Sequence, residues 1–261
     1  MGLAIAQVFA AQGYAVVIMS RNKQRLAGWA EELDQTARSK LQSEGQLAPK
    51  EEQLAAAVSC DVLDTDSVKA GMAEALRLFP TRRLGTAIYN ASVRKKAPFI
   101  EQTEQQVKDS LQASVVSAFA FLQATVREMI KPAADTSSGN QERKGPIGGN
   151  ILVTGATSAT RGREGFAAFS SGKTGLRRLC EVAAREHGPD GVHVAHVFVD
   201  GLIDSDTARK FLGFDTSKGE RFADGTVVLP SEAAKSYLFL AQQQRAAWTF
   251  EMDLRPAKEH F

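Results

Sequence analysis

Short apolar runs alternate with longer amphipathic segments along this chain, and that alternation limits its fold more than any other feature. Runs that are mostly apolar suit strands buried on both faces of a parallel sheet, and they lie at residues 14–19, 55–60, 86–89, 150–154, 192–199 and 248–254. Helical periodicity fills the intervals at residues 3–12, 23–41, 64–79, 103–130, 164–187 and 231–244. We therefore predict one α/β domain over residues 1–261, a Rossmann-like doubly wound parallel sheet.

Two intervening segments do not fit this alternation. Residues 133–149 are rich in Gly, Ser, Pro and charge, which predicts a mobile surface loop. Residues 205–225 are polar and predicted to be irregular, with apolar side chains at Phe211, Leu212, Phe214 and Phe222. These four either form one wall of a substrate pocket or pack a loop that closes over a cofactor. For the helix at 64–79, Asp66 or Thr65 is the expected cap.

Composition argues against several classes of partner. With 32 basic and 30 acidic residues the net charge is +2, which gives no electrostatic reason to expect nucleic acid or a membrane surface. No apolar run approaches the roughly 18 residues of a membrane-spanning helix, so we expect a cytoplasmic location. Two cysteines exclude a disulfide framework, and no metal site is predicted. His193 and His196 point to opposite faces of one strand, which suits core or interface histidines.

Parallel strands joined by right-handed crossovers place all their carboxyl ends on one edge of the sheet. The ligand crevice of such a sheet lies outside that edge. The side chains expected to meet there are those of Ser20, Arg21, Asp61, Asn90, Thr154 and Gly201.

Four stretches at these strand ends, in this order, resemble motifs of the short-chain dehydrogenase/reductase family. They are Cys60-Asp61-Val62, Asn90-Ala91-Ser92, Phe169-Ser170-Ser171-Gly172-Lys173 and Asp200-Gly201-Leu202-Ile203-Asp204-Ser205. Each is weak alone, but together they are specific, and the resemblance covers essentially the whole chain. It implies hydride transfer with a nicotinamide cofactor. It also implies a homodimer or homotetramer formed through the helices at 103–130 and 164–187.

The resemblance also implies a set of cofactor-binding positions. These are Gly2, Ser20, Arg21, Asp61, Val62, Asn90, Ala91, Lys173, Gly201, Ile203 and Ser205. An arginine at position 21 accommodates the 2′-phosphate of NADP, where an acidic residue would accept the 2′-hydroxyl of NAD. We therefore expect NADP(H), with NAD(H) as the other candidate. Two alternatives stay open: Asp61 holds the adenine or caps a turn, and Lys173 holds the nicotinamide ribose or is an exposed helix lysine.

The catalytic positions of the family have mostly changed here. Lys173 is retained, but Phe169 stands at the tyrosine position, Ala156 at the serine position and Ser114 at the asparagine position. A phenyl ring neither donates nor accepts a proton, so it supplies no general acid. The segments 154–157 and 253–256 resemble a divergent branch of the family that also has Phe before the lysine. Asp200 either substitutes as the acid or caps a loop.

The family begins with a strand and a glycine turn of the form Gly-x-x-x-Gly-x-Gly, of which only Gly2 has a match here. Either the natural start lies about 20 to 30 residues upstream, or the short chain is the natural one. We expect the first, an N-terminally truncated domain that lacks its first strand. A sheet without that inner strand has two unpaired edges and a gap in its core, and we expect it to fold poorly.

Two functions fit these observations. The first is an NADP(H)-dependent oxidoreductase that uses a displaced acid, or catalyses a reaction that needs no tyrosine, on a substrate that the sequence does not name. The second is a pseudoenzyme that binds NADP(H), or an oligomeric partner protein, without hydride transfer.

Overall fold

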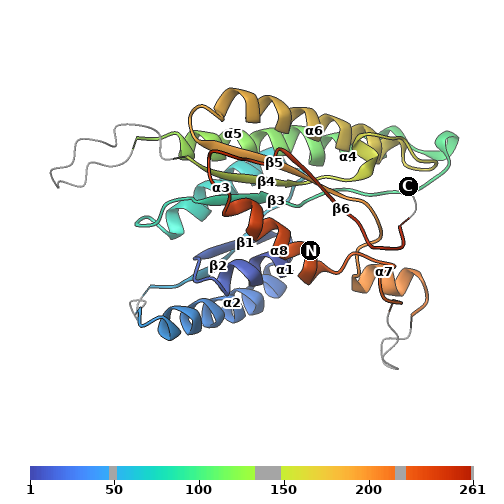
Figure 1. The fold of residues 1–261 in the computed structure, drawn as a ribbon. Coiled ribbons are helices and arrows are strands. Elements are labelled where there is room, and N and C mark those ends of the chain that lie inside the picture. The colour runs from blue at the N-terminus through green and yellow to red at the C-terminus, as the bar shows by residue number, and fades with distance from the viewer. Residues whose placement is uncertain (47–51, 133–147, 215–221, 260–261) are drawn as a thin grey trace.

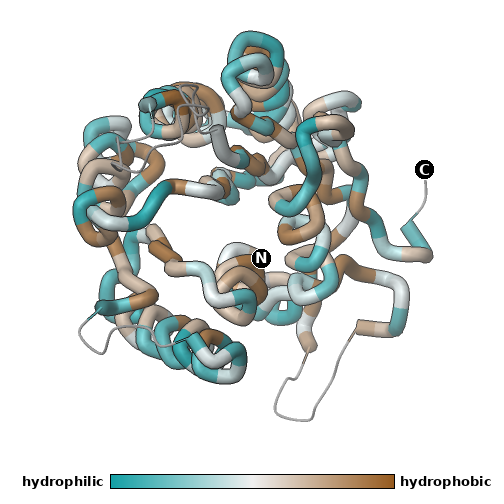
Figure 2. The backbone as a smooth tube through the Cα atoms, turned by 60° about the vertical axis from the view of Figure 1, so that its left-hand side comes forward, coloured by the Kyte–Doolittle hydropathy of each residue, from teal (hydrophilic) through white to brown (hydrophobic). Residues whose placement is uncertain are grey.

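The computed structural model describes residues 1–46, 52–132, 148–214 and 222–259. Helices cover both faces of parallel strands, as predicted (Figure 1). The helices α3 (Thr65–Leu78), α5 (Ser117–Met129) and α6 (Ala167–His187) pack on one face, and α1 (Gly2–Ala10) and α8 (Pro230–Ala241) pack on the other. The α2 helix (Lys23–Ser43) covers the N-terminal strands. Figure 2 shows hydrophobic and hydrophilic residues alternating along the helices, which fits helices with one apolar face.

The strands form two separate parallel sheets in the part of the chain that the structure describes. One sheet pairs β1 (Val16–Ser20) with β2 (Ala55–Ser59). The other has the order β3 (Thr86–Tyr89), β4 (Gly149–Thr154), β5 (Val192–Val199) and β6 (Glu251–Leu254). All six predicted strands are present and parallel, which confirms the predicted fold class.

The side chains of β1 are more exposed to solvent than those of β5, an inner strand of the larger sheet. Four of its five residues are half-buried and the fifth is exposed, whereas seven of the eight residues of β5 are buried. No backbone pairing joins β1 to β3 among the described residues. Among the described residues, β1 and β3 therefore each have one edge that pairs with no strand.

The predicted single helix at 103–130 is wrong. It is divided into α4 (Glu104–Leu111), a π-helical turn (Gln112–Val116) and α5. This turn lies where α6 comes close, at two glycines. A Cβ atom at Gly172 would lie 2.5 Å from Ser110 Oγ, and one at Gly175 would lie 2.6 Å from a methyl of Val115. A single wide turn leaves the overall apolar periodicity intact, so the sequence pattern does not reveal it.

Three smaller expectations also need correction. Residues 205–225 are not wholly irregular, because α7 (Asp206–Phe211) begins there, capped by Ser205 Oγ, which accepts from Ala208 N at 3.1 Å. The α3 helix is capped by Asp64 rather than by Asp66 or Thr65. Most of the predicted loop at 133–149 lies outside the described residues, and its last residue, Gly149, begins β4. None of the described helices is both long enough and apolar enough to cross a membrane.

Candidate functional site

A chain of buried hydrogen bonds crosses the carboxyl end of β4. Thr154 Oγ1 donates to Asn90 Oδ1 at 2.8 Å. Since that donation uses the only proton of the threonine hydroxyl, Tyr237 Oη, 2.6 Å from the same oxygen, is the donor to Thr154. Tyr237 is fully buried on α8, and burial raises the pKa of its phenol. The end of β3 is thus tied to β4 and α8.

Lys173 reaches Thr154 from the other face of the sheet. Its Nζ donates to the Thr154 carbonyl at 2.8 Å, and only 2% of the residue is exposed. Burial lowers the pKa of this ammonium group to about 8. The interpretation of Lys173 as an exposed helix lysine is therefore wrong.

The ring of Phe169 occupies the position next to this amine. Its centroid lies 5.9 Å from Lys173 Nζ and 6.3 Å from the Phe166 ring centroid. Phe169 is 7% exposed, and neither ring carries a proton donor. Proton transfer from this position is therefore excluded.

The hydroxyl and carboxyl groups of Thr157 and Asp200, near the Ala156 position, are engaged with each other and with nearby arginines. Ala156 has no polar side chain, and the hydroxyl of Thr157 donates to Asp200 at 2.5 Å. The Asp200 carboxylate is also 3.3 Å from Arg255 and 3.8 Å from Arg161. This favours the second of the two interpretations of Asp200, a carboxylate that ties a loop.

Ser114 lies in the π-helical turn and is fully buried. Its Oγ and that of Ser110 have no hydrogen-bond partner among the described residues. Buried hydroxyls without partners are uncommon, and a bound water often satisfies them.

The predicted cofactor positions occupy both sheets. Gly2 begins α1 against the end of β3, since a Cβ atom there would lie 3.3 Å from Asn90 Nδ2. Ser20 and Arg21 are exposed at the end of β1, while Val62 and Ala91 pack at the edge of the main core. Asp61 Oδ1 accepts a hydrogen bond from Leu63 N at 3.0 Å. This is the contact of a turn cap, one of the two roles considered for Asp61.

The segment 201–205 takes the shape that its glycine permits. Gly201 has φ 138°, and a Cβ atom there would lie 2.7 Å from Pro256. Ile203 forms an isolated bridge with Val228, and Ser205 caps α7. A cavity of about 640 Å³ lies against this segment, with Asp204 and Phe222 in its lining.

Of the three expected pocket-wall residues whose side chains the structure describes, Phe222 lines this cavity, whereas Leu212 and Phe214 do not. Phe214 packs on Phe222 with ring centroids 4.6 Å apart, and Leu212 is 50% exposed. The side chain of Phe211 lies outside the described residues.

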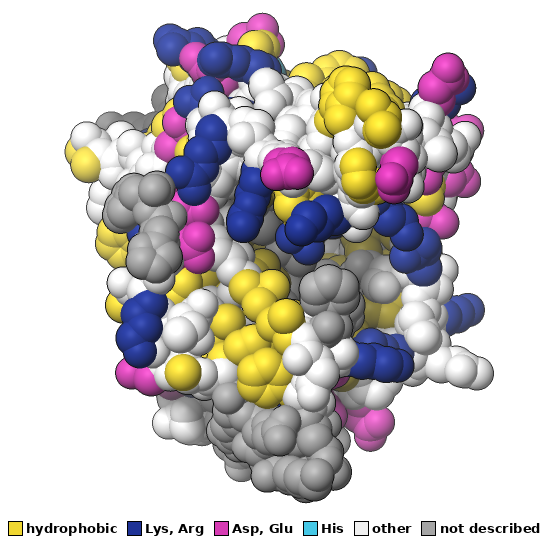
Figure 3. Space-filling view, turned by 90° about the vertical axis from the view of Figure 1, so that its right-hand side faces the viewer, with side chains coloured by type: hydrophobic (Ala, Val, Ile, Leu, Met, Phe, Trp, Pro, Cys, Tyr) yellow, Lys and Arg dark blue, Asp and Glu magenta, His cyan; other side chains and the backbone are white. Residues whose placement is uncertain are grey.

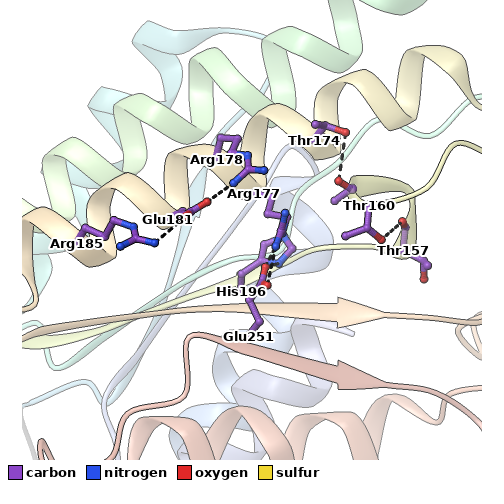
Figure 4. Close-up of polar contacts among 10 residues, drawn as sticks. Thr157, Thr160, Thr174, Arg177, Arg178, Glu181, Arg185, His196 and Glu251 are labelled. Carbon is purple, nitrogen blue, oxygen red and sulfur yellow. Dashed lines mark hydrogen bonds and ion pairs between the residues drawn. The ribbon is translucent and has the colours of Figure 1, made fainter.

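Both histidines of β5 are core residues, as predicted. His193 stacks on Trp248 with ring centroids 5.0 Å apart. His196 is fully buried, with Nδ1 3.5 Å from Glu251 Oε1, and burial lowers its pKa to about 4. Arg177 of α6 also donates two hydrogen bonds, of 2.7 and 2.8 Å, to the Glu251 carboxylate (Figure 4). These contacts tie α6 to β6.

Sequence reasoning missed two residues of the site. The sequence places Thr154 at the end of a strand but does not predict its hydrogen bonds, which join Asn90, Tyr237 and Lys173. Tyr237 carried no local signal, since it lies 83 residues from its partner Thr154.

Comparisons with known proteins agree with this architecture. Residues 1–213 match the family model described as short chain dehydrogenase. The chain is 23% identical over 246 residues to carbonyl reductase family member 4 of Danio rerio, covering 92% of this chain and 86% of that protein. A short-chain dehydrogenase from Rhodopseudomonas palustris has a TM-score of 0.68 at 28% identity, covering 97% of this chain and 92% of that chain.

An NADPH-bound short chain oxidoreductase from Pseudomonas aeruginosa PAO1, whose catalytic center is described as atypical, shares the fold. The TM-score is 0.69 at 22% identity, covering 97% of this chain and 90% of that chain. With a family model matched over most of its length, the chain belongs to the short-chain dehydrogenase family.

Proposed function

We propose that the protein is an NADP(H)-dependent oxidoreductase whose site works without a tyrosine acid. The observation that carries this proposal is Lys173, buried beside the Phe169 ring and held by the Thr154 carbonyl. A carbonyl reductase among the relatives and an NADPH-bound structure among the neighbours support it.

The residues present fit a nicotinamide dinucleotide. Gly2 starts α1 with no side-chain cap, so first-turn N–H groups stay available for phosphate, and a larger residue would crowd Asn90. Arg21 and Ser20 would hold the 2′-phosphate, and Lys173 the ribose hydroxyls. When bound, the cofactor supplies or accepts the hydride.

Protonation of the substrate is the step for which the side chains of this site offer the least. Phe169 and Ala156 have no proton to give, and the Asp200 carboxylate is held by Thr157 and Arg255. A reaction that takes its proton from water needs no proton donor from the protein. Reduction of an activated carbon–carbon double bond is one such reaction. If the protein binds NADP(H) but reduces no such substrate, its function is binding without hydride transfer.

Replacement of Arg21 tests the cofactor preference. In Arg21→Ala we expect NADPH affinity to fall about tenfold or more, because a charge-assisted contact to phosphate is lost. NADH affinity should stay unchanged, which makes NADH the internal control. Calorimetric titration of both cofactors measures this, and equal losses for the two would contradict a role at the 2′-phosphate.

We also propose that two copies pair through α4, α5 and α6. Large apolar side chains stand exposed on these helices and the turn between α4 and α5: Leu111, Val116, Phe119 and Val182. Phe119→Glu should convert dimers to monomers in light scattering, because the interface would bury an unpaired charge. Phe99→Glu, at an exposed phenylalanine outside these helices, is the control. A Phe119→Glu protein with unchanged mass would contradict this interface.

A further inference from the structure

Two loops at the carboxyl end of the sheet carry an excess of positive charge. The loop after β3 contains Arg94, Lys95 and Lys96, and the loop before α6 contains Arg161 and Arg163. A hydrogen bond from Ala97 N to Gly165 O, 3.1 Å long, joins the loops. Within residues 91–98 and 160–166 the only acidic residue is Glu164. Figure 3 faces this edge and shows Lys and Arg side chains around a hollowed area with hydrophobic side chains.

Two of these cations converge on one aromatic ring. Arg94 Cζ lies 4.6 Å and Lys96 Nζ 5.9 Å from the centroid of Phe166, which is 5% exposed. A guanidinium stacked on a ring keeps its N–H donors free at the edge, in the fork geometry that matches carboxylate and phosphate.

Arg161 lies 3.8 Å from the Asp200 carboxylate, but the other arginines of the two loops lack such a partner in the part of the chain that the structure describes. Among the described residues, Arg94, Lys96 and Arg163 form no ion pair. Burial lowers the pKa of Arg94, and the positive charge of nearby Arg163 lowers it further. Two like charges are therefore held close together without an anion between them, and an anionic ligand would relieve that repulsion.

This cluster adjoins the position where the reaction would occur. Phe166 packs against Phe169 with ring centroids 6.3 Å apart, and Phe169 in turn lies beside Lys173. The cations therefore lie one aromatic ring away from Phe169. Arg21, the residue proposed for the cofactor 2′-phosphate, is in the other sheet at the end of β1.

We infer that Arg94 and Arg163, with Lys96, bind an anionic group of the substrate, a carboxylate or a phosphate held about one ring width from the reacting carbon. The inference rests on the proposed function for the position of the reacting carbon. It narrows the substrate class to acids that carry a carbonyl or activated double bond.

Binding of three matched aldehydes to the protein saturated with NADP⁺ tests this inference, since the oxidised cofactor donates no hydride. The probes are 4-formylbenzoate, 4-formylphenyl phosphate and the neutral 4-formylbenzamide, titrated calorimetrically with and without NADP⁺. We expect at least one anionic probe to bind about tenfold more tightly than the amide, the gain typical of charge-assisted hydrogen bonds. The tighter of the two identifies the group as carboxylate or phosphate.

Two variants and a control locate the effect. Arg94→Gln and Arg163→Gln should each remove most of this roughly tenfold anion preference and leave the affinity for the amide unchanged. Arg127→Gln, at an exposed arginine on α5 outside both loops, should change none of the affinities. Equal binding of anions and amide by the wild type would overturn the inference, as would an effect of Arg127→Gln as large as that of Arg94→Gln.

NADPH titration of the same samples separates this inference from the proposed function. A protein that binds NADPH without preferring the anionic probes contradicts the anion site alone. One that prefers them but binds no NADPH contradicts the proposed function and retains the anion site.

Discussion

Phe169→Tyr should raise the rate of NADPH-dependent aldehyde reduction by about 10²- to 10⁴-fold, the usual contribution of a positioned general acid. The substitution adds a hydroxyl to a ring beside Lys173, and the nearby ammonium charge favours the phenolate. Lys173 and Thr154, the other groups of the candidate site beside this ring, are already in place. Steady-state kinetics with 4-formylbenzoate and NADPH measure the effect.

Phe121→Tyr is the matched control, because it adds the same hydroxyl to another buried ring, one that packs against Tyr89 and not beside Lys173. It should leave the rate near that of the wild type. Wild-type activity that Phe169→Tyr does not change would mean that another group already supplies the proton. If neither form is active although both bind NADPH, the alternative function, NADP(H) binding without hydride transfer, is favoured.

Replacing Lys173 should reveal its burial through the pH dependence of stability. The pKa of this lysine falls from the ordinary 10.5 to about 8 in the folded protein, so between these pH values the unfolded chain binds more protons. The free energy of unfolding therefore rises with pH in that window. Relative to Lys173→Met, the wild type should gain up to about 3 kcal/mol between pH 7 and pH 10.5.

Urea unfolding of both proteins at several pH values measures this difference. Cys180 is buried beside the lysine, and its pKa is raised to about 12, but it is present in both proteins, so its titration largely cancels. Lys23→Met, at an exposed lysine, should differ from wild type by an amount that does not depend on pH. Parallel stability curves for wild type and Lys173→Met would mean that Lys173 is solvated rather than buried.

The sequence predicted the fold well because each strand and most helices carry a local pattern. The absence of an inner strand stays a prediction; among the described residues, β1 and β3 each have an edge that pairs with no strand. It failed where the deciding contact is tertiary. The π-helical turn depends on the approach of α6 at Gly172, and α7 is too short to show periodicity.

The candidate site was predicted in outline. Strand-end positions converge because topology forces them to, so Asn90 and Thr154 are expected at one edge of the sheet, whereas Lys173 lies on a helix and its place there is implied only by the family resemblance. Their hydrogen bonds were not predictable, since Tyr237 reaches Thr154 from α8 across the sheet. Whether Lys173 is buried depends on which face of α6 meets the sheet, and whether Asp200 is free depends on Arg255, which follows β6.

Calorimetric titration of NADPH and NADH into the protein tests the central claim most directly. We expect NADPH to bind, and to bind more tightly than NADH. At about 100 times its dissociation constant, NADPH should add ~2.7 kcal/mol of stability, which melting experiments would show independently. Binding of neither cofactor would contradict the account, because Lys173, Gly2 and Arg21 would then serve the fold alone.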